Sequence, residues 1–235
     1  MNNKIKMLAL LTGLLIAGQA SAADVTSAPQ KDGSTKITAE SKDWKGESLL
    51  KTEYTISKDS PFNQVTTQYN VKVYQIEDND GLVSKSGVYN NNSSLLKVDS
   101  EPKSAVQTVS THKDPLATVS VGNETTYVKS VSRRVDFDKE IGSFTVVPGI
   151  VKSGFDFAAF PVGKDIYNVH LSQDELLGIQ DFKAGEDAIG LPSVSSWSAA
   201  NVVYLPEGKT ARFDSPSFTV DGKSYKNVYL ISAKK

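Results

Sequence analysis

The sequence contains no cysteine and only two histidines, His112 and His170, among its 235 residues. Without thiols, the chain cannot form a disulfide, a thiolate metal site or a cysteine nucleophile. The 26 basic and 27 acidic residues nearly cancel, so the chain lacks the positive field typical of nucleic-acid-binding proteins. A Walker loop, a dinucleotide fingerprint and the serine and zinc hydrolase motifs are also missing. We therefore expect no cofactor, no resident metal, no nucleic-acid partner and no enzymatic activity.

The first 22 residues have the features of a secretory signal peptide. Lys4 and Lys6 precede an almost uninterrupted apolar run over residues 7–18, and residues 20–22 (ASA) match the small-residue pattern of a cleavage site. The run has about 12 residues, fewer than the roughly 20 that span a bilayer. The sequence thus predicts export, with cleavage before Ala23 and no membrane span.

The mature chain begins with a polar segment and continues with segments of strand-like alternation. Residues 23–35 lack a hydrophobic period, which predicts a flexible N-terminal arm. From Lys36 onward, apolar residues tend to recur at every second position, as in a sheet with one buried face. The Asp80-Gly81 dipeptide favours a hairpin turn. The spacing of the strands is typical of an all-β sandwich or barrel of antiparallel strands. The strand candidates are residues 50–57, 67–76, 82–89, 95–98, 105–110, 117–121, 125–137, 143–147, 166–171, 201–205, 217–220 and 225–232.

Two short helical turns and one internal boundary interrupt this pattern. Residues 172–175 (SQDE) form a capping box that precedes two leucines and Gly178, which predicts a single turn of helix. A second turn is predicted at residues 187–191. Proline and glycine in residues 148–154 indicate a break between two β-rich halves, residues 36–147 and 155–235, which form either two domains or one.

Few residues qualify for chemistry. His170 shares a predicted strand face with Asn168, and we interpret it as a solvent-facing or hydrogen-bonded strand histidine rather than a general base. Residues 136–140 (DFDKE) and 77–81 (EDNDG) contain oxygen ligands but no full calcium set, so we interpret them as a strand end and a hairpin tip. Among aromatic residues that could form a carbohydrate platform, Trp197 lies between small polar residues and is the best candidate for contact with a ligand. The other aromatic candidates, Trp44, Tyr204, Tyr225 and Tyr229, are assigned to the core.

The C-terminus carries a resemblance to a known family. Gly222 lies 14 residues from the end and precedes a β-rich tail, residues 224–232 (SYKNVYLIS). This ending resembles that of subunits of chaperone/usher-type bacterial fimbriae. The resemblance implies an incomplete immunoglobulin-like sandwich that is completed by the N-terminal arm of a partner subunit through β-strand addition. It assigns the donor role to residues 23–39, with Thr35, Ile37 and Ala39 as the alternating residues. The resemblance also implies an assembly role for four residues of the C-terminal ending, Gly222, Tyr225, Val228 and Tyr229.

These observations lead us to expect an exported, non-enzymatic surface or periplasmic β-protein of a Gram-negative bacterium. The first hypothesis is a minor or structural fimbrial subunit that pairs with other subunits or with an assembly chaperone, and that binds a host glycan or another surface ligand. The second is a periplasmic assembly chaperone or envelope-binding module, because the chain reads as two halves. The third is a hydrolase that uses two converging carboxylates, although no motif selects a pair.

Overall fold

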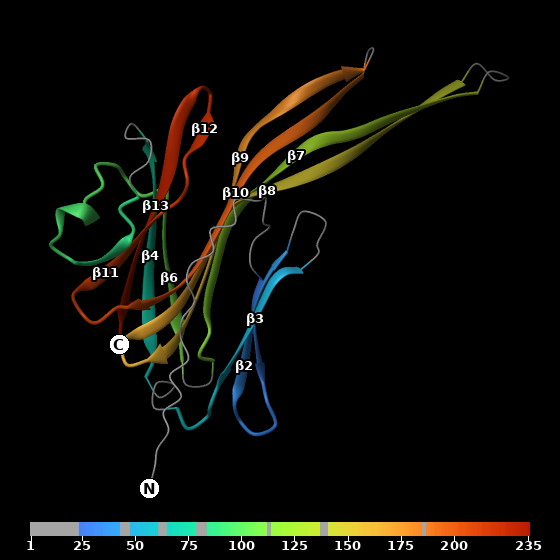
Figure 1. The fold of residues 1–235 in the computed structure, drawn as a ribbon. Helices are drawn as coiled ribbons and strands as arrows, with labels where there is room; N and C mark the ends of the chain where they lie inside the picture. Colours follow the sequence, from blue (N-terminus) through green and yellow to red (C-terminus); the bar gives the residue numbers. More distant parts are fainter. Residues whose placement is uncertain are drawn as a thin grey trace, which may run out of the picture.

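The computed structural model describes residues 24–42, 48–60, 65–78, 84–111, 114–136, 141–184 and 187–235, and the predicted signal peptide lies outside them. The described residues form an all-β fold of antiparallel sheets with one short 3₁₀ turn (Figure 1). The elements are β1 (Asp24–Pro29), β2 (Thr35–Lys42), β3 (Ser48–Ile56), β4 (Thr67–Glu77), β5 (Gly87–Asn90), η2 (Ser94–Leu96), β6 (Ser104–Ser110), β7 (Ala117–Asp136), β8 (Ile141–Gly163), β9 (Ile166–Ala184), β10 (Asp187–Tyr204), β11 (Lys209–Asp214), β12 (Phe218–Val220) and β13 (Lys223–Lys234).

Two of the sheets pack face to face as a β-sandwich. One has the strand order β10-β9-β8-β7, and the other has the order β5-β11-β13-β4-β6, with β12 added beside β13. Residues at alternate positions of these strands point into a shared core, which confirms the period of two seen in the sequence. The finer immunoglobulin-like assignment stays a prediction. The largest buried side chains of this core are Tyr69, Val71, Phe157, Tyr167, Val169, Leu171, Leu205, Tyr229 and Ile231.

The third sheet, β1-β2-β3, covers the opposite face of the β7–β10 sheet (Figure 1). Its buried residues Ile37 and Ile56 belong to a second apolar cluster together with Leu116, Ala158 and Phe160. The predicted flexible arm at residues 23–35 is therefore wrong for the described part, because residues 24–29 form β1 and pair with β2. The reason is a local turn: the Asp32 carboxylate accepts a hydrogen bond from the backbone N–H of Ser34, and Gly33 supplies a φ of +81°.

Strands β7 to β10 are far longer than the sequence predicts, and their hairpins project beyond the sandwich (Figure 1). The predicted break at residues 148–154 lies inside β8, and the predicted segments 117–121 and 125–137 are merged in β7. Glycine explains both errors. Gly122 and Gly154 pair across the ladder, where a Cβ on Gly154 would lie 2.1 Å from the Val121 carbonyl oxygen. These glycines permit a close approach of two paired strands and do not end them.

Both predicted helical turns are also wrong. Residues 172–174 pair with β8 on one side, and residues 172–175 pair with β10 on the other. A capping box satisfies backbone N–H groups that have no partner at the start of a helix. Residues 172–175 pair with neighbouring strands instead, so no helix begins there. Residues 187–191 belong to β10. The predicted strand at residues 95–98 is replaced by the 3₁₀ turn η2, and β11 was not predicted.

Candidate functional site

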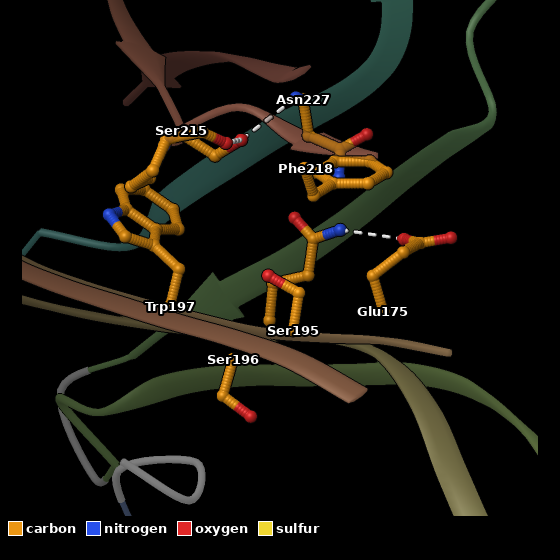
Figure 2. Close-up of a pocket in the computed structure, with 9 residues that line it drawn as sticks. Glu175, Ser195, Ser196, Trp197, Ser215, Phe218 and Asn227 are labelled. Atoms are coloured by element: carbon orange, nitrogen blue, oxygen red, sulfur yellow. Dashed lines mark hydrogen bonds between the residues drawn. The ribbon is translucent and has the colours of Figure 1, made fainter. Parts of the chain in front are cut away.

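The interior of the sandwich changes from apolar to polar toward one end. On β9, the inward positions run from Leu171 to Gln173 and Glu175, and on β13 they run from Tyr229 to Asn227. The polar side chains end the core at a small pocket between the two sheets (Figure 2). Its cavity volume is about 30 Å³. The pocket is lined by Gln173, Glu175, Ser195, Ser196, Trp197, Ser215, Pro216, Phe218 and Asn227.

Asn227 is the most unusual residue of this pocket. It is 0% exposed, and neither the Oδ1 nor the Nδ2 atom of its side chain has a hydrogen-bond partner among the described residues. Its backbone is held firmly, because its N–H donates to Ser215 Oγ (2.9 Å) and its carbonyl oxygen accepts from the Ser215 N–H (2.8 Å). A buried amide without partners costs about 1–3 kcal/mol for each unsatisfied group. Such a group is expected where a bound water or ligand supplies the missing hydrogen bonds.

A hydrogen-bond chain fixes the side of the pocket formed by β9. The Tyr229 hydroxyl donates to Gln173 Oε1, and Gln173 Nε2 donates to Glu175 Oε2 (2.8 Å). Lys103 Nζ lies 2.8 Å from Glu175 Oε1, so the carboxylate is paired with a cation. Burial raises the pKa of Tyr229, so its hydroxyl stays protonated and remains a donor. The Gln173 and Glu175 side chains are thereby held in defined orientations.

Trp197 supplies the aromatic part of the pocket. Its indole stacks on the Tyr229 ring with the centroids 5.5 Å apart and the planes 25° from parallel, and it is partly buried against the sandwich core. Figure 2 shows Trp197 beside Ser215, on the side of the pocket away from Glu175. Ser196 points away from the pocket in the same view, and its hydroxyl lies 2.5 Å from Asp174 Oδ1. Burial, together with the neighbouring Asp156 carboxylate, raises the pKa of Asp174.

The assembly residues predicted from the sequence lie in two separate places. Ile37 and Ala39 are buried in β2, where Thr35 is the first residue. The other four lie in β13 or in the turn before it, where Gly222 has a φ of +77°. Strand β13 pairs with β11 on one side and β4 on the other, so neither of its edges is open along these ladders. Those four residues are Gly222, Tyr225, Val228 and Tyr229.

The residues considered for acid–base or metal chemistry have structural partners or lie outside the described residues. His170 is buried on the outer face of β9 and stacks on Phe160, with ring centroids 6.3 Å apart. Burial lowers the pKa of His170 to about 4, so the ring is neutral near pH 7. Glu77 and Asp78 pair with Lys223 and Lys226. Within the described residues, no group of three or more acidic or histidine side chains is arranged to hold a metal ion. The predicted residues His112, Trp44 and Asp80-Gly81 and most of 136–140 lie outside the described residues.

The sequence identified Trp197 but missed its polar neighbours. Gln173 and Glu175 were assigned to a helix cap, and Asn227 was not singled out within the C-terminal strand. A signal was present, because Asn227 occupies the same alternate register as Tyr225 and Tyr229. A polar residue in an otherwise apolar register marks a place where the core meets a cavity or a ligand.

No family model, curated protein or solved structure matches this chain. In the part of the chain that the structure describes, no helix is long and apolar enough to cross a membrane. The fold and the pocket therefore carry the functional argument.

Proposed function

We propose that this protein is an exported, non-enzymatic surface subunit of the fimbrial kind, and that it binds a carbohydrate residue in the pocket of Trp197 and Asn227. The observation that carries the proposal is the buried Asn227 amide, whose donor and acceptor atoms both lack partners. It lines a pocket that also contains an indole ring.

The chemistry of a sugar ring fits these groups. Each hydroxyl both donates and accepts a hydrogen bond, which is the combination that a fixed amide satisfies. The Glu175 carboxylate and the Gln173 amide add acceptors and a donor beside it, and Trp197 offers apolar surface for the C–H groups of a ring. The cavity volume of about 30 Å³ is enough for one hydroxyl group or one water, so one hydroxyl of the sugar would enter the pocket.

The arrangement favours binding over hydrolysis. Glycoside hydrolases generally use two carboxyl groups on opposite sides of the scissile bond. Among the described residues that line the pocket, Glu175 alone carries a carboxylate, and that carboxylate is paired with Lys103. Asp174, the next acidic residue on β9, bonds to Ser196 and is directed to the other face of the sheet.

The projecting hairpins support the assignment to an assembly. Ile150, Phe182 and Leu191 are 60%, 56% and 50% exposed on β8, β9 and β10. Exposed apolar groups of this size on projecting strands are typical of surfaces that contact other proteins. Cell fractionation tests this part of the proposal: we expect the protein in sheared surface material. Recovery in the periplasm alone, together with a client subunit, would favour the assembly-chaperone alternative.

Replacement of Asn227 by leucine tests the pocket. Asn227→Leu removes both unpartnered polar atoms with little change in volume, so the variant should be as stable as the wild type or more stable. It should lose at least about tenfold in affinity for any glycan that the wild type binds on an array, because one good hydrogen bond to the ligand is worth about 1.4 kcal/mol. The matched control is Asn123→Leu, an exposed position on β7. A wild-type protein that binds no glycan, or an unchanged affinity in a folded Asn227→Leu variant, would contradict the proposal.

A further inference from the structure

The β1–β3 sheet is a self-contained unit. Its strands pair only with one another, and in the described residues no backbone hydrogen bond joins it to either sheet of the sandwich. Lys36 on β2 and Glu53 on β3 form an ion pair within the sheet (2.8 Å). The sheet therefore keeps its own hydrogen bonds and this ion pair whether or not it is docked on the sandwich.

Apolar side chains make up the cluster between this sheet and the sandwich. Ile37 is 0% exposed, and Tyr54 contacts Phe160 edge-on with ring centroids 5.1 Å apart. On the sandwich side, the docking face consists of Leu116, Ala158 and Phe160. Apolar contacts of this kind are not directional, so the same face accepts an identical sheet from another molecule.

The docking face also contains polar atoms that gain no partner there. His170 Nε2 and Asn168 Oδ1 are buried and lack hydrogen bonds among the described residues. Both residues lie on the face of β9 that is turned away from the sandwich core, and His170 stacks on Phe160 of the docking face. Opening the interface would return these atoms to water, which lowers the cost of undocking.

We propose that the β1–β3 sheet exchanges between copies of this chain, so that the sheet of one molecule docks on Leu116, Ala158 and Phe160 of the next. The occupant of the docking face is thus the β1–β3 sheet of a second copy. Residues 57–66 connect β3 to β4, and these ten residues reach at most about 35 Å when extended. Exchange of an identical element keeps every native contact while joining molecules, and a head-to-tail exchange builds an open chain of subunits.

This inference is independent of the pocket, because it concerns assembly through the opposite face of the β7–β10 sheet. It also differs from insertion of a single donor strand at a sheet edge. The whole three-stranded unit moves, and side-chain packing rather than a new backbone ladder holds it in place.

Isotope mixing tests the exchange on the full-length mature chain. Equal amounts of ¹⁵N-labelled and unlabelled protein are concentrated together, opened in mild urea, returned to buffer and separated by size. Lysine cross-linking of the dimer and monomer fractions then joins Lys36 or Lys51 to lysines of the sandwich, and mass spectrometry identifies the isotope of each partner. We expect about half of these links in the dimer to join a labelled to an unlabelled chain, because exchanged sheets come at random from either pool.

Two variants separate exchange from nonspecific association. Ile37→Asp places a charge on the docking side of β2 and should abolish the mixed links, whereas Thr38→Asp changes the opposite side of the same strand and should retain them. Retention of the melting transition of the sandwich in Ile37→Asp shows that the loss is specific, since the two apolar clusters are separate. The proposal is overturned if no dimer forms, if the dimer contains only links within one isotope, or if both variants behave alike.

Discussion

The buried imidazole of His170 makes the stability of the fold depend on pH in a way that can be calculated. Burial lowers the pKa of His170 from 6.5 to about 4 in the folded state, and the ring stacks on Phe160 under the β1–β3 sheet. An unfolded chain would bind a proton at His170 near pH 6.5, whereas the folded chain stays neutral until about pH 4. The unfolded state therefore binds more protons throughout this interval.

The sign and size of the effect follow from proton linkage. The free energy of unfolding should be at its full value above about pH 6.5, fall as the pH is lowered, and level off below about pH 4. At about 1.4 kcal/mol for each pH unit of the interval, the total loss is about 3 kcal/mol. Between pH 7 and pH 5 the loss is about 2 kcal/mol, because titration of the unfolded state is only beginning at the upper limit.

Urea denaturation at pH 7 and pH 5 measures this loss directly. The His170→Gln variant keeps a polar side chain without a titrating group, so its pH dependence should be smaller than that of the wild type by about 2 kcal/mol. His112→Gln, which removes the other histidine of the chain, is the comparison variant. The raised pKa of Asp174 changes the free energy of unfolding in the opposite direction, because the folded state favours the protonated carboxyl group. This contribution is the same in the wild type and in the histidine variants, so it cancels when they are compared. Equal pH dependences in His170→Gln and the wild type would refute the reasoning.

Two further predictions concern the backbone and a buried ion pair. Gly154→Ala should lower the free energy of unfolding by about 4 kcal/mol or more in thermal or urea unfolding, because a Cβ there meets the Val121 carbonyl oxygen. Gly222→Ala should lower it by only about 1–2 kcal/mol, because Gly222 has a φ of +77° but open space around it. Equal losses in the two variants would contradict this account. Arg212→Met should cost about 3–5 kcal/mol because it leaves the Asp214 carboxylate buried without its cation, and adding Asp214→Asn should restore part of that loss, whereas no restoration would argue against the pairing.

The all-β class could be predicted because the alternating register is a property of each strand taken alone. Residues 67–76 and 225–232 were identified by this register, and they pair with each other as β4 and β13. The lengths of β7 to β10 could not be predicted in the same way. Gly122 and Gly154 look like strand ends locally, and only their pairing across the ladder shows that both strands continue.

The candidate site shows the same limit. Trp197 was singled out by its polar neighbours, but the position of Asn227 opposite Gln173 depends on how two sheets stack. The N-terminal segment was misread for a related reason. Polar strands without large apolar residues look disordered, yet β1 pairs with β2, where Ile37 and Ala39 are buried, and Val25 packs against the cluster that contains Ile37.

The position of β13 has a consequence for how this chain acquires its structure. The last strand of the sequence lies between β4 and β11, and Lys234 pairs with Gln68, far upstream. Contacts that span so much sequence form slowly, and none of them can form until the C-terminal residues have been synthesised. Until then, β4 has no partner on the side that β13 later occupies, and this sheet stays incomplete. Completion of the β5-β11-β13-β4-β6 sheet therefore waits for residues 223–234, so the placement of one strand makes this sheet a late event in folding.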